Sequence, residues 1–320
     1  MKNKILFNIC CLFILLIVKN GVSANEFIFD SAEINITNNG NLINAGKGIA
    51  KSNKDNITIE ADKFRYNKKL SLLNTSKGIV KSIKDNIEIK ANNFIYDENL
   101  SLLSAVGDVE IKDLTNKTII KSESIFYYTK KKIIESEKSS NIKDMFGNIF
   151  SVKSFRYTIL DNIIKIDNAE VIDVEKNLFK IDKAFINLKK NKLIGKDISI
   201  DFNNTAFQKD NEPRLKGNSI SIDKNISKIT KGVFTTCKKN DDCPPWQLSA
   251  KEIKHDKSKK IIYYKDAWLK LYDKPIFYFP KFFHPDPTVK RQSGFLMPSF
   301  VDSSNLGGSF NVPYYHVLSN

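Results

Sequence analysis

The chain has 320 residues and a mass of 36.6 kDa, with 41% hydrophobic residues, 13 glycines, 9 prolines and a formal net charge of +15. This composition excludes a collagen-like, coiled-coil or wholly disordered chain and favours one or two globular domains. Only four of the 51 basic residues are arginine, and lysine recurs in nearly every polar turn. Nucleic-acid sites favour arginine and concentrate charge on one face, so no nucleic-acid partner is predicted.

Residues 1–24 have the pattern of a signal peptide. Lys2 and Lys4 precede an apolar run from Ile5 to Val18, and Val22-Ser23-Ala24 supplies the small residues of a cleavage site. The run ends at Lys19, short of the about 20 residues of a membrane-spanning helix, which disfavours an anchored helix. Cleavage removes three lysines, lowers the charge from +15 to +12 and implies an exported, oxidising compartment for the rest of the chain.

Two cysteines remain after this segment, Cys237 and Cys243, in a polar loop. The simplest prediction is one local disulfide that closes this loop. A zinc site is disfavoured, because it needs four ligands and the nearest histidine is His255. Disulfides with cysteines outside this chain stay open as an alternative.

An internal repeat organises the chain. Residues 47–76 and 77–106 are identical at 17 of 30 positions. The unit weakens afterwards, but its centres can be followed at intervals of 30, 31, 30, 29, 36 and 33 residues; they are Phe64, Phe94, Ile125, Phe155, Ala184, Ile220 and Ile253. Seven units of near-constant period predict a stacked architecture in which each unit contacts mainly its neighbours.

Each unit has the pattern of a strand, a tight turn and a second strand. Apolar residues alternate with polar ones, as at Ile57 and Ile59, and the alternation resumes at Phe64 after a one-residue slip. This pattern predicts half-buried strands with a bend or bulge between them. A polar turn such as 67–69 leads to the next strand, and no helical stripe follows Asn25, so we expect an essentially all-β domain.

Stacked strands with one apolar face either close on themselves or leave a trough in which acyl chains can lie. Most apolar residues of any sheet form an ordinary core, because a sheet must bury one face. Acidic residues of the turns, such as Asp85 and Asp161, are expected to bend the chain. The candidates for a lipid groove are Ile57, Ile59, Phe64, Tyr66, Ile87, Ile89, Phe94, Tyr96, Ile125, Tyr127, Phe155 and Tyr157.

An enzymatic site is not predicted. The three histidines, His255, His284 and His316, are far apart, and the chain contains no HExxH, GxSxG, phosphate-loop or GxGxxG motif. His284-Pro285-Asp286 resembles half of a metal site, but no third ligand is nearby in the sequence. We therefore predict no metal, no cofactor and no catalytic residue.

From Phe234 onward, aromatic residues and prolines become frequent, with five prolines between 275 and 298. Proline is excluded from helix interiors and central strands, so an extended, turning connector is expected here. The same region carries five short motifs: Thr235-Thr236-Cys237, Trp246–Ala250 with Glu252-Ile253, Pro275–Pro280, Lys290–Ser299 and Val312–Tyr315. Over about residues 230–320, these motifs in combination resemble the LptD family of LPS-assembly outer-membrane proteins, also called organic solvent tolerance proteins.

The resemblance implies a fold and a domain organisation. The upstream repeats resemble, by pattern, the family's periplasmic domain, a twisted β-jelly roll of taco-like shape. The implied parts are a signal peptide at 1–24, the repeat β-jelly-roll periplasmic domain at 25–233, a last repeat with the proline- and aromatic-rich connector at 234–298, and the first strands of an outer-membrane β-barrel at 299–320. Family members continue into a large barrel, so this chain is expected to be the amino-terminal part of a longer protein.

The resemblance also implies transport without covalent chemistry. Lipopolysaccharide or a related glycolipid would pass along the apolar groove toward the barrel, at the cell outer membrane. A periplasmic bridge protein would add a strand at the edge formed by Phe29, Ile34 and Ile36, and a lipoprotein would plug the barrel. In the family, disulfides tie this domain to the barrel, and without those partners Cys237 and Cys243 would pair by default.

Two alternatives remain at this point. One is a freestanding periplasmic lipid-binding bridge protein of the same jelly-roll type. The other is a surface repeat adhesin, which the proline- and aromatic-rich connector disfavours because a simple solenoid does not need such a segment.

Overall fold

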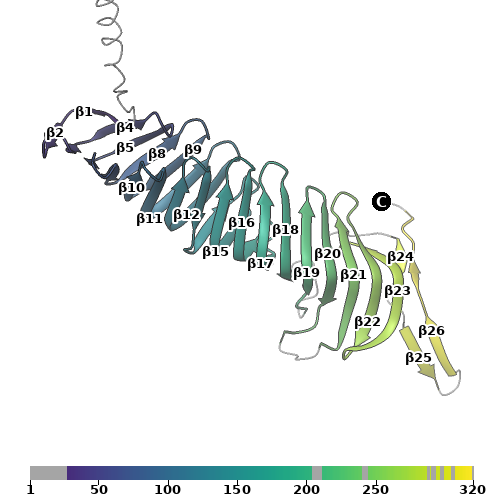
Figure 1. Ribbon diagram of the computed structural model, residues 1–320. Coiled ribbons are helices and arrows are strands. Elements are labelled where there is room, and N and C mark those ends of the chain that lie inside the picture. Colours follow the sequence, from purple (N-terminus) through teal and green to yellow (C-terminus); the bar gives the residue numbers. More distant parts are fainter. Residues whose placement is uncertain are drawn as a thin grey trace, which may run out of the picture.

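The structure is a computed structural model that describes residues 27–203, 211–239, 244–286, 289, 293–295, 299–303 and 307–318. The predicted signal peptide at 1–24 and Cys243 lie outside the described residues. Regular structure in the described ranges consists of strands (Figure 1), which confirms the all-β prediction. Within these ranges no helix has the length and apolar character needed to cross a membrane.

The strands fall into a short amino-terminal set and a longer set. The short strands are β1 (Ile28–Ser31), β2 (Ile34–Thr37), β3 (Leu42–Ala45), β4 (Gly48–Ser52), β5 (Ile57–Ala61), β6 (Phe64–Asn67), β7 (Leu72–Thr75), β8 (Gly78–Ser82), β9 (Ile87–Ala91) and β10 (Asn93–Asp97). They are followed by β11 (Leu102–Asp113), β12 (Thr118–Tyr128), β13 (Ile133–Ser136), β14 (Ser140–Lys143), β15 (Ile149–Thr158), β16 (Ile163–Ile172), β17 (Leu178–Asn187), β18 (Lys192–Asp201), β19 (Arg214–Asp223), β20 (Ile226–Thr235), β21 (Trp246–Asp256), β22 (Ile261–Leu271) and β23 (Lys274–Pro285). The last strands are β24 (Gly294–Phe295), β25 (Ser299–Ser303), β26 (Gly307–Asn311) and β27 (Tyr314–Tyr315).

Strands β1 to β23 form one antiparallel sheet that is folded into two layers. In the first layer β2, β3, β6, β7 and β10 pair in sequence, and in the second layer β1, β4, β5, β8 and β9 do so. β11 pairs with both β10 and β9, and most of the following strands run through both layers. This topology confirms the predicted stack of strand–turn–strand units and the jelly-roll-like fold class. The pairs β24–β27 and β25–β26 are separate, and their assignment to a barrel stays a prediction.

The corner between the two layers lies where the sequence pattern slips. β5 ends at Ala61 and β6 begins at Phe64, so the chain turns from the second layer into the first at the predicted bend. In the long strands the corner contains residues with positive φ, such as Asp108 (47°), Asp197 (51°) and Asp266 (50°), which interrupt the ladder. Such a residue leaves the pairing and bends its strand, as a β-bulge does.

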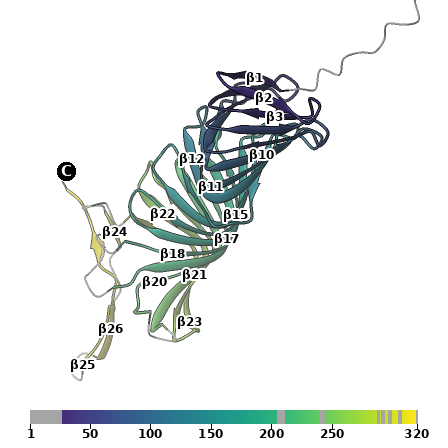
Figure 2. The same ribbon diagram turned by 90° about the vertical axis from the view of Figure 1, so that its left-hand side faces the viewer.

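The interior is lined by rows of side chains that pass from strand to strand. All seven predicted repeat centres, from Phe64 to Ile253, belong to one row of the first layer. Each of them exposes 4% of its surface or less. A second row in the other layer begins at Phe29 in β1 and ends at Phe277 in β23, and every residue in it is apolar. Figure 2 shows the strands fanning out toward β21–β23 as the sheet twists.

β23 differs from the sequence prediction, which expected a turning connector in this segment. It is a strand that pairs with β22 and with no other strand of the described chain, so it forms the edge of the sheet. Pro280 lies at the corner, opposite Asp266, where the ladder is interrupted. Edge strands tolerate proline because their outward N–H groups need no partner. The prediction of a connector was therefore wrong for 274–285.

Gly78 begins β8 at a point where two backbones approach closely. A Cβ atom at position 78 would lie 2.2 Å from the carbonyl oxygen of Glu60, and one at the equivalent Gly48 would lie 2.3 Å from that of Asp30. We expect Gly78→Ala to lower the free energy of unfolding by about 2 kcal/mol in urea denaturation, because a backbone must move. Replacement of the exposed neighbour Lys77 by alanine should change it by less than about 0.5 kcal/mol; equal effects would contradict the close approach.

Candidate functional site

The candidate site is the apolar interior between the two layers. All twelve residues predicted as lipid-groove candidates belong to one buried core cluster. Each exposes 3% of its surface or less. In this structure they pack against one another as an ordinary core, and their contact with lipid stays a prediction.

Four of these residues are tyrosines, spaced 30 or 31 positions apart, whose buried hydroxyls donate to carboxylates. The bonds are Tyr66 to Glu98 Oε2 (2.6 Å), Tyr96 to Asp55 Oδ2, Tyr127 to Asp85 Oδ2 (3.1 Å) and Tyr157 to Asp113 Oδ2. Asp55, Asp85 and Asp113 lie at the turns of the second layer, whereas the tyrosines belong to the first. The three bonds to aspartates therefore join the layers along one side of the interior, whereas Glu98 follows β10 in the first layer. We call the four bonds the tyrosine seam.

Burial is the main cause that raises the pKa of Tyr96, Tyr127 and Tyr157 well above 10. The three hydroxyls therefore stay protonated and act as donors. The acceptors were not predicted from the sequence, and Asp85 was expected only to bend its turn. The available signal was the recurrence of Ser-x-x-Asp at 52–55 and 82–85, in step with the tyrosines.

Asp85 is the carboxylate of the seam that also forms an ion pair. Its Oδ2 lies 2.6 Å from Lys132 Nζ and accepts a hydrogen bond from Ser82 at 2.5 Å, in addition to that from Tyr127. The side chains of Asp85 and Lys132 are 7% and 16% exposed. Burial alone would raise the pKa of Asp85, but the bonds from Lys132, Ser82 and Tyr127 outweigh it and hold that pKa below its usual value. The charged carboxylate thus ties a turn of the second layer to the first layer.

The seam ends after the fourth tyrosine. Asn116 still bridges the two sides, because its side-chain amide donates to Asn162 Oδ1 at 2.8 Å. In the row that contains Tyr157, the next strands place Ile164 and then Ile186. Their side chains cannot donate hydrogen bonds, so the same closure does not continue at these positions.

Burial of the interior decreases toward the carboxyl-terminal strands. Five aromatic residues there are only half-buried and pack against the core: Phe202, Phe234, Trp246, Phe279 and Phe282. The ring centroids of Phe234 and Trp246 are 6.0 Å apart, and those of Phe279 and Phe282 are 5.3 Å apart. This end of the interior therefore offers aromatic surface that a ligand can reach without breaking the seam.

The amino-terminal edge of the sheet is formed by β1 and β2. Among the described strands, β1 pairs with β4 and β2 with β3, so each has one unpaired side. Ile34 and Ile36 expose 46% and 59% of their surfaces. Phe29 is half-buried instead, and its ring centroid lies 5.8 Å from that of Phe64. The edge is thus present where strand addition was predicted, although Phe29 packs against the core.

A hollow of about 790 Å³ lies beside this edge, between β2, β3, β6 and β7. Its charged lining residues are Glu33, Lys63 and Arg65. The hollow is open and of mixed polarity, so it is distinct from the apolar interior.

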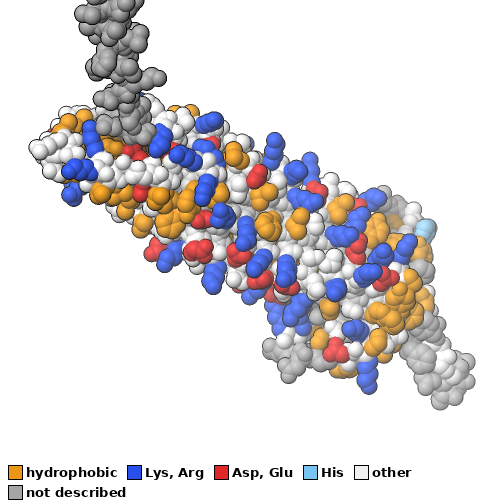
Figure 3. Space-filling view, in the orientation of Figure 1, with side chains coloured by type: hydrophobic (Ala, Val, Ile, Leu, Met, Phe, Trp, Pro, Cys, Tyr) orange, Lys and Arg blue, Asp and Glu red, His pale blue; other side chains and the backbone are white. Residues whose placement is uncertain are grey.

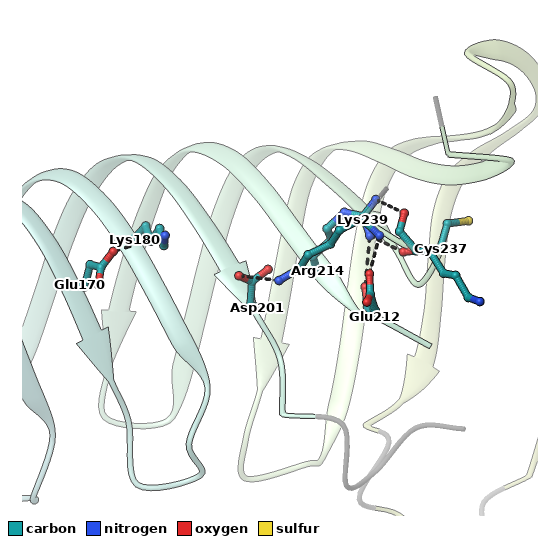
Figure 4. Close-up of polar contacts among 8 residues, drawn as sticks. Glu170, Lys180, Asp201, Glu212, Arg214, Cys237 and Lys239 are labelled. Carbon is teal, nitrogen blue, oxygen red and sulfur yellow. Dashed lines mark hydrogen bonds and ion pairs between the residues drawn. The ribbon is translucent and has the colours of Figure 1, made fainter. Parts of the chain in front are cut away.

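Cys237 follows β20 in a loop that Arg214 holds in place. The Arg214 guanidinium donates to the backbone oxygens of Cys237, Glu212 (3.3 Å) and Lys238 (3.2 Å) (Figure 4). The thiol is half-buried, and Sγ lies 3.6 Å from the backbone oxygen of Trp246. Cys237 forms no disulfide within the described chain. Because Cys243 lies outside it, their pairing stays a prediction.

Two histidines that are separate in the sequence meet near the end of β23. His284 Nε2 lies 2.9 Å from the hydroxyl of Tyr264, and His255 Nε2 lies 2.6 Å from Asp286 Oδ2. Burial lowers the pKa of His284. The described residues contain no group of three or more His, Cys, Asp or Glu side chains that could hold a metal ion.

The geometry defines a class of protein: a stacked two-layer β-domain with a continuous apolar interior and unpaired edge strands. Relatives that match parts of this chain are named LPS-assembly protein LptD. That of Ralstonia nicotianae is 38% identical over 94 residues, which are 29% of this chain and 11% of the relative. That of Nitrosococcus oceani is 31% identical over 135 residues, 42% of this chain and 17% of the relative. That of Francisella tularensis subsp. novicida is 36% identical over 74 residues, which are 23% of this chain and 8% of the relative.

These comparisons confirm the resemblance that the sequence motifs predicted: over part of its length the chain is similar to LptD proteins. The matched stretches span 8 to 17% of the length of these three relatives. No family model matches the chain. Among solved structures, LptH from Pseudomonas aeruginosa, described as the LptA homologous periplasmic component of the lipopolysaccharide transport device, is 18% identical with a TM-score of 0.28, over 32% of this chain and 76% of that chain.

Proposed function

We propose that this chain carries lipopolysaccharide, or a related glycolipid, along its apolar interior toward the outer membrane. The observation that carries the proposal is the uninterrupted apolar row from Phe29 to Phe277. Acyl chains need a continuous slot lined by apolar and aromatic side chains. Their transport requires no covalent chemistry. The similarity to LPS-assembly proteins supports this function over a freestanding bridge protein or an adhesin.

The proposal assigns a role to each part of the chain. Residues 1–24 direct export, 25–233 form the periplasmic lipid-carrying domain, 234–298 complete the stack, and 299–320 begin a barrel at the cell outer membrane. A periplasmic bridge protein adds a strand at β2, and a lipoprotein plugs the barrel. The two unpaired strands at the amino-terminal edge support the first of these partnerships.

Site-specific photo-crosslinking tests the transport function. A photo-reactive phenylalanine analogue at Phe94, which faces the interior, or at the half-buried Phe234 should capture lipopolysaccharide in cells that synthesise it. The matched control is Ile95, which neighbours Phe94 on the outer face of β10 and is 45% exposed. Capture at Ile95 equal to that at the interior positions, or no capture with the β circular-dichroism spectrum intact, would contradict the proposal.

A further inference from the structure

The outer face of the last hairpin of the sheet differs in chemistry from the outer face of earlier strands. On the earlier strands several outward positions hold charged residues that pair across strands, such as Lys121 with Glu110 at 3.5 Å and Arg156 with Glu135 at 2.8 Å. On β22 and β23 the outward positions alternate with interior residues such as Tyr264. They include Tyr263, Lys265, Trp268, Tyr278, Lys281 and Phe283. The Tyr278 hydroxyl donates to Asp266 Oδ1 at 2.9 Å.

The aromatic residues of this face stand in two cross-strand pairs. The ring centroids of Trp268 and Tyr278 are 4.9 Å apart, and those of Tyr263 and Phe283 are 6.1 Å apart. Trp268 and Tyr278 each expose 41% of their surfaces, and Phe283 exposes 61%. Figure 3 shows hydrophobic side chains gathered near this end of the molecule, with basic side chains close by. Contiguous exposed aromatic surface of this kind marks a site of contact with another protein or with a membrane.

A pair of lysines lies between the two aromatic pairs. Lys265 and Lys281 are directly opposite each other, and both are exposed. Neither is in an ion pair with a described carboxylate; Glu252, the β21 neighbour of Lys265, is bonded to Lys228 at 2.8 Å. Like charges directly opposite destabilise a sheet. An external anion between them would remove that repulsion.

We propose that the outer face of the β22–β23 hairpin docks on the surface of a bilayer that contains anionic headgroups. Tryptophan and tyrosine combine an apolar ring with a polar group and favour the membrane–water boundary. Lysine ammonium groups are attracted to anionic lipid phosphates. A protein interface fits less well, because its core is depleted in lysine. The face lies on the opposite side of the sheet from the interior, so this docking is independent of the proposed transport.

Tryptophan fluorescence tests the docking, because the chain has two tryptophans. Trp246→Phe leaves Trp268 on the proposed face, and Trp268→Phe leaves the half-buried Trp246. With vesicles of phosphatidylethanolamine and phosphatidylglycerol that carry brominated acyl chains, Trp268 should be quenched and its emission should shift to shorter wavelength, whereas Trp246 should not respond. An unresponsive Trp268, or quenching of Trp246 alone, would overturn the proposal; the second result would report lipid in the interior instead.

Co-sedimentation of the otherwise unaltered chain with the same vesicles gives a second measurement. Lys265→Gln combined with Lys281→Gln should weaken vesicle binding about 30-fold, and vesicles of phosphatidylcholine alone should bind weakly. The matched control combines Lys121→Gln with Phe126→Ser on the outer face of β12, where Phe126 is 45% exposed; it should bind like the parent chain. Absence of vesicle binding by the parent chain, or equal losses in both variants, would overturn the proposal and point to a protein partner.

Discussion

Replacement of Asp85 by asparagine is expected to lower the free energy of unfolding by about 3 kcal/mol. The substitution leaves the ammonium of Lys132, whose side chain is 16% exposed, without its carboxylate at 2.6 Å. Removing one partner of a buried ion pair is strongly destabilising, because the remaining charge stays desolvated. Urea denaturation followed by circular dichroism measures the change. The matched control is Asp161→Asn in an exposed turn, which should change the free energy by less than about 0.5 kcal/mol.

The pH dependence of the same experiment separates the ion pair from a packing defect. The pKa of Asp85 is lower in the folded chain than its ordinary value, so its stabilisation is fully present above the unfolded pKa of about 3.9. It is lost as the pH falls below about 4 and through the folded pKa. The parent chain and the Asp85→Asn variant should therefore converge in stability on acidification. A difference that stays constant below pH 4 would show that the carboxylate charge is not the cause.

Replacement of Ile36 by proline is expected to weaken binding of the purified periplasmic bridge protein about 10- to 100-fold. Gly46 N–H donates to the Glu33 carbonyl at 3.0 Å, which makes Glu33 and Gly46 a hydrogen-bonded pair. Because such pairs alternate in an antiparallel ladder, the N–H groups of Ile34 and Ile36 point away from β3. Proline at position 36 removes one outward donor and leaves an acceptor of the added strand unpaired. Biolayer interferometry measures the affinity.

The control for this variant is Ile36→Thr, which keeps the backbone N–H and should bind within about threefold of the parent chain. An equal loss in both variants would assign the binding to the side chain and not to strand addition. Unchanged binding by the proline variant would place the partner elsewhere on the molecule.

Much of the fold could be predicted because its signals are local. The alternation at Ile57 and Ile59 assigns these side chains to one face, and the one-residue slip before Phe64 locates the corner between the layers. The nature of the segment 274–285 could not be predicted in this way. Proline excludes a central strand, but whether a strand is central or at an edge depends on which other strands pair with it. In the structure, β23 pairs with β22 and with no other described strand, which identifies it as an edge strand.

The stack of strand–turn–strand units with one apolar face could be predicted without coordinates, because period-two alternation and a repeat of about 30 residues are local features of the chain. How that apolar face is closed depends on which residues the folded sheet places opposite one another. The hydrogen bond from Tyr127 to Asp85 joins residues 42 positions apart in different layers. Alternation states which way a side chain points but not what lies opposite it across a folded sheet. For the same physical reason, the closed seam of the amino-terminal half and the half-buried aromatic residues near β23 emerged only from the assembled fold.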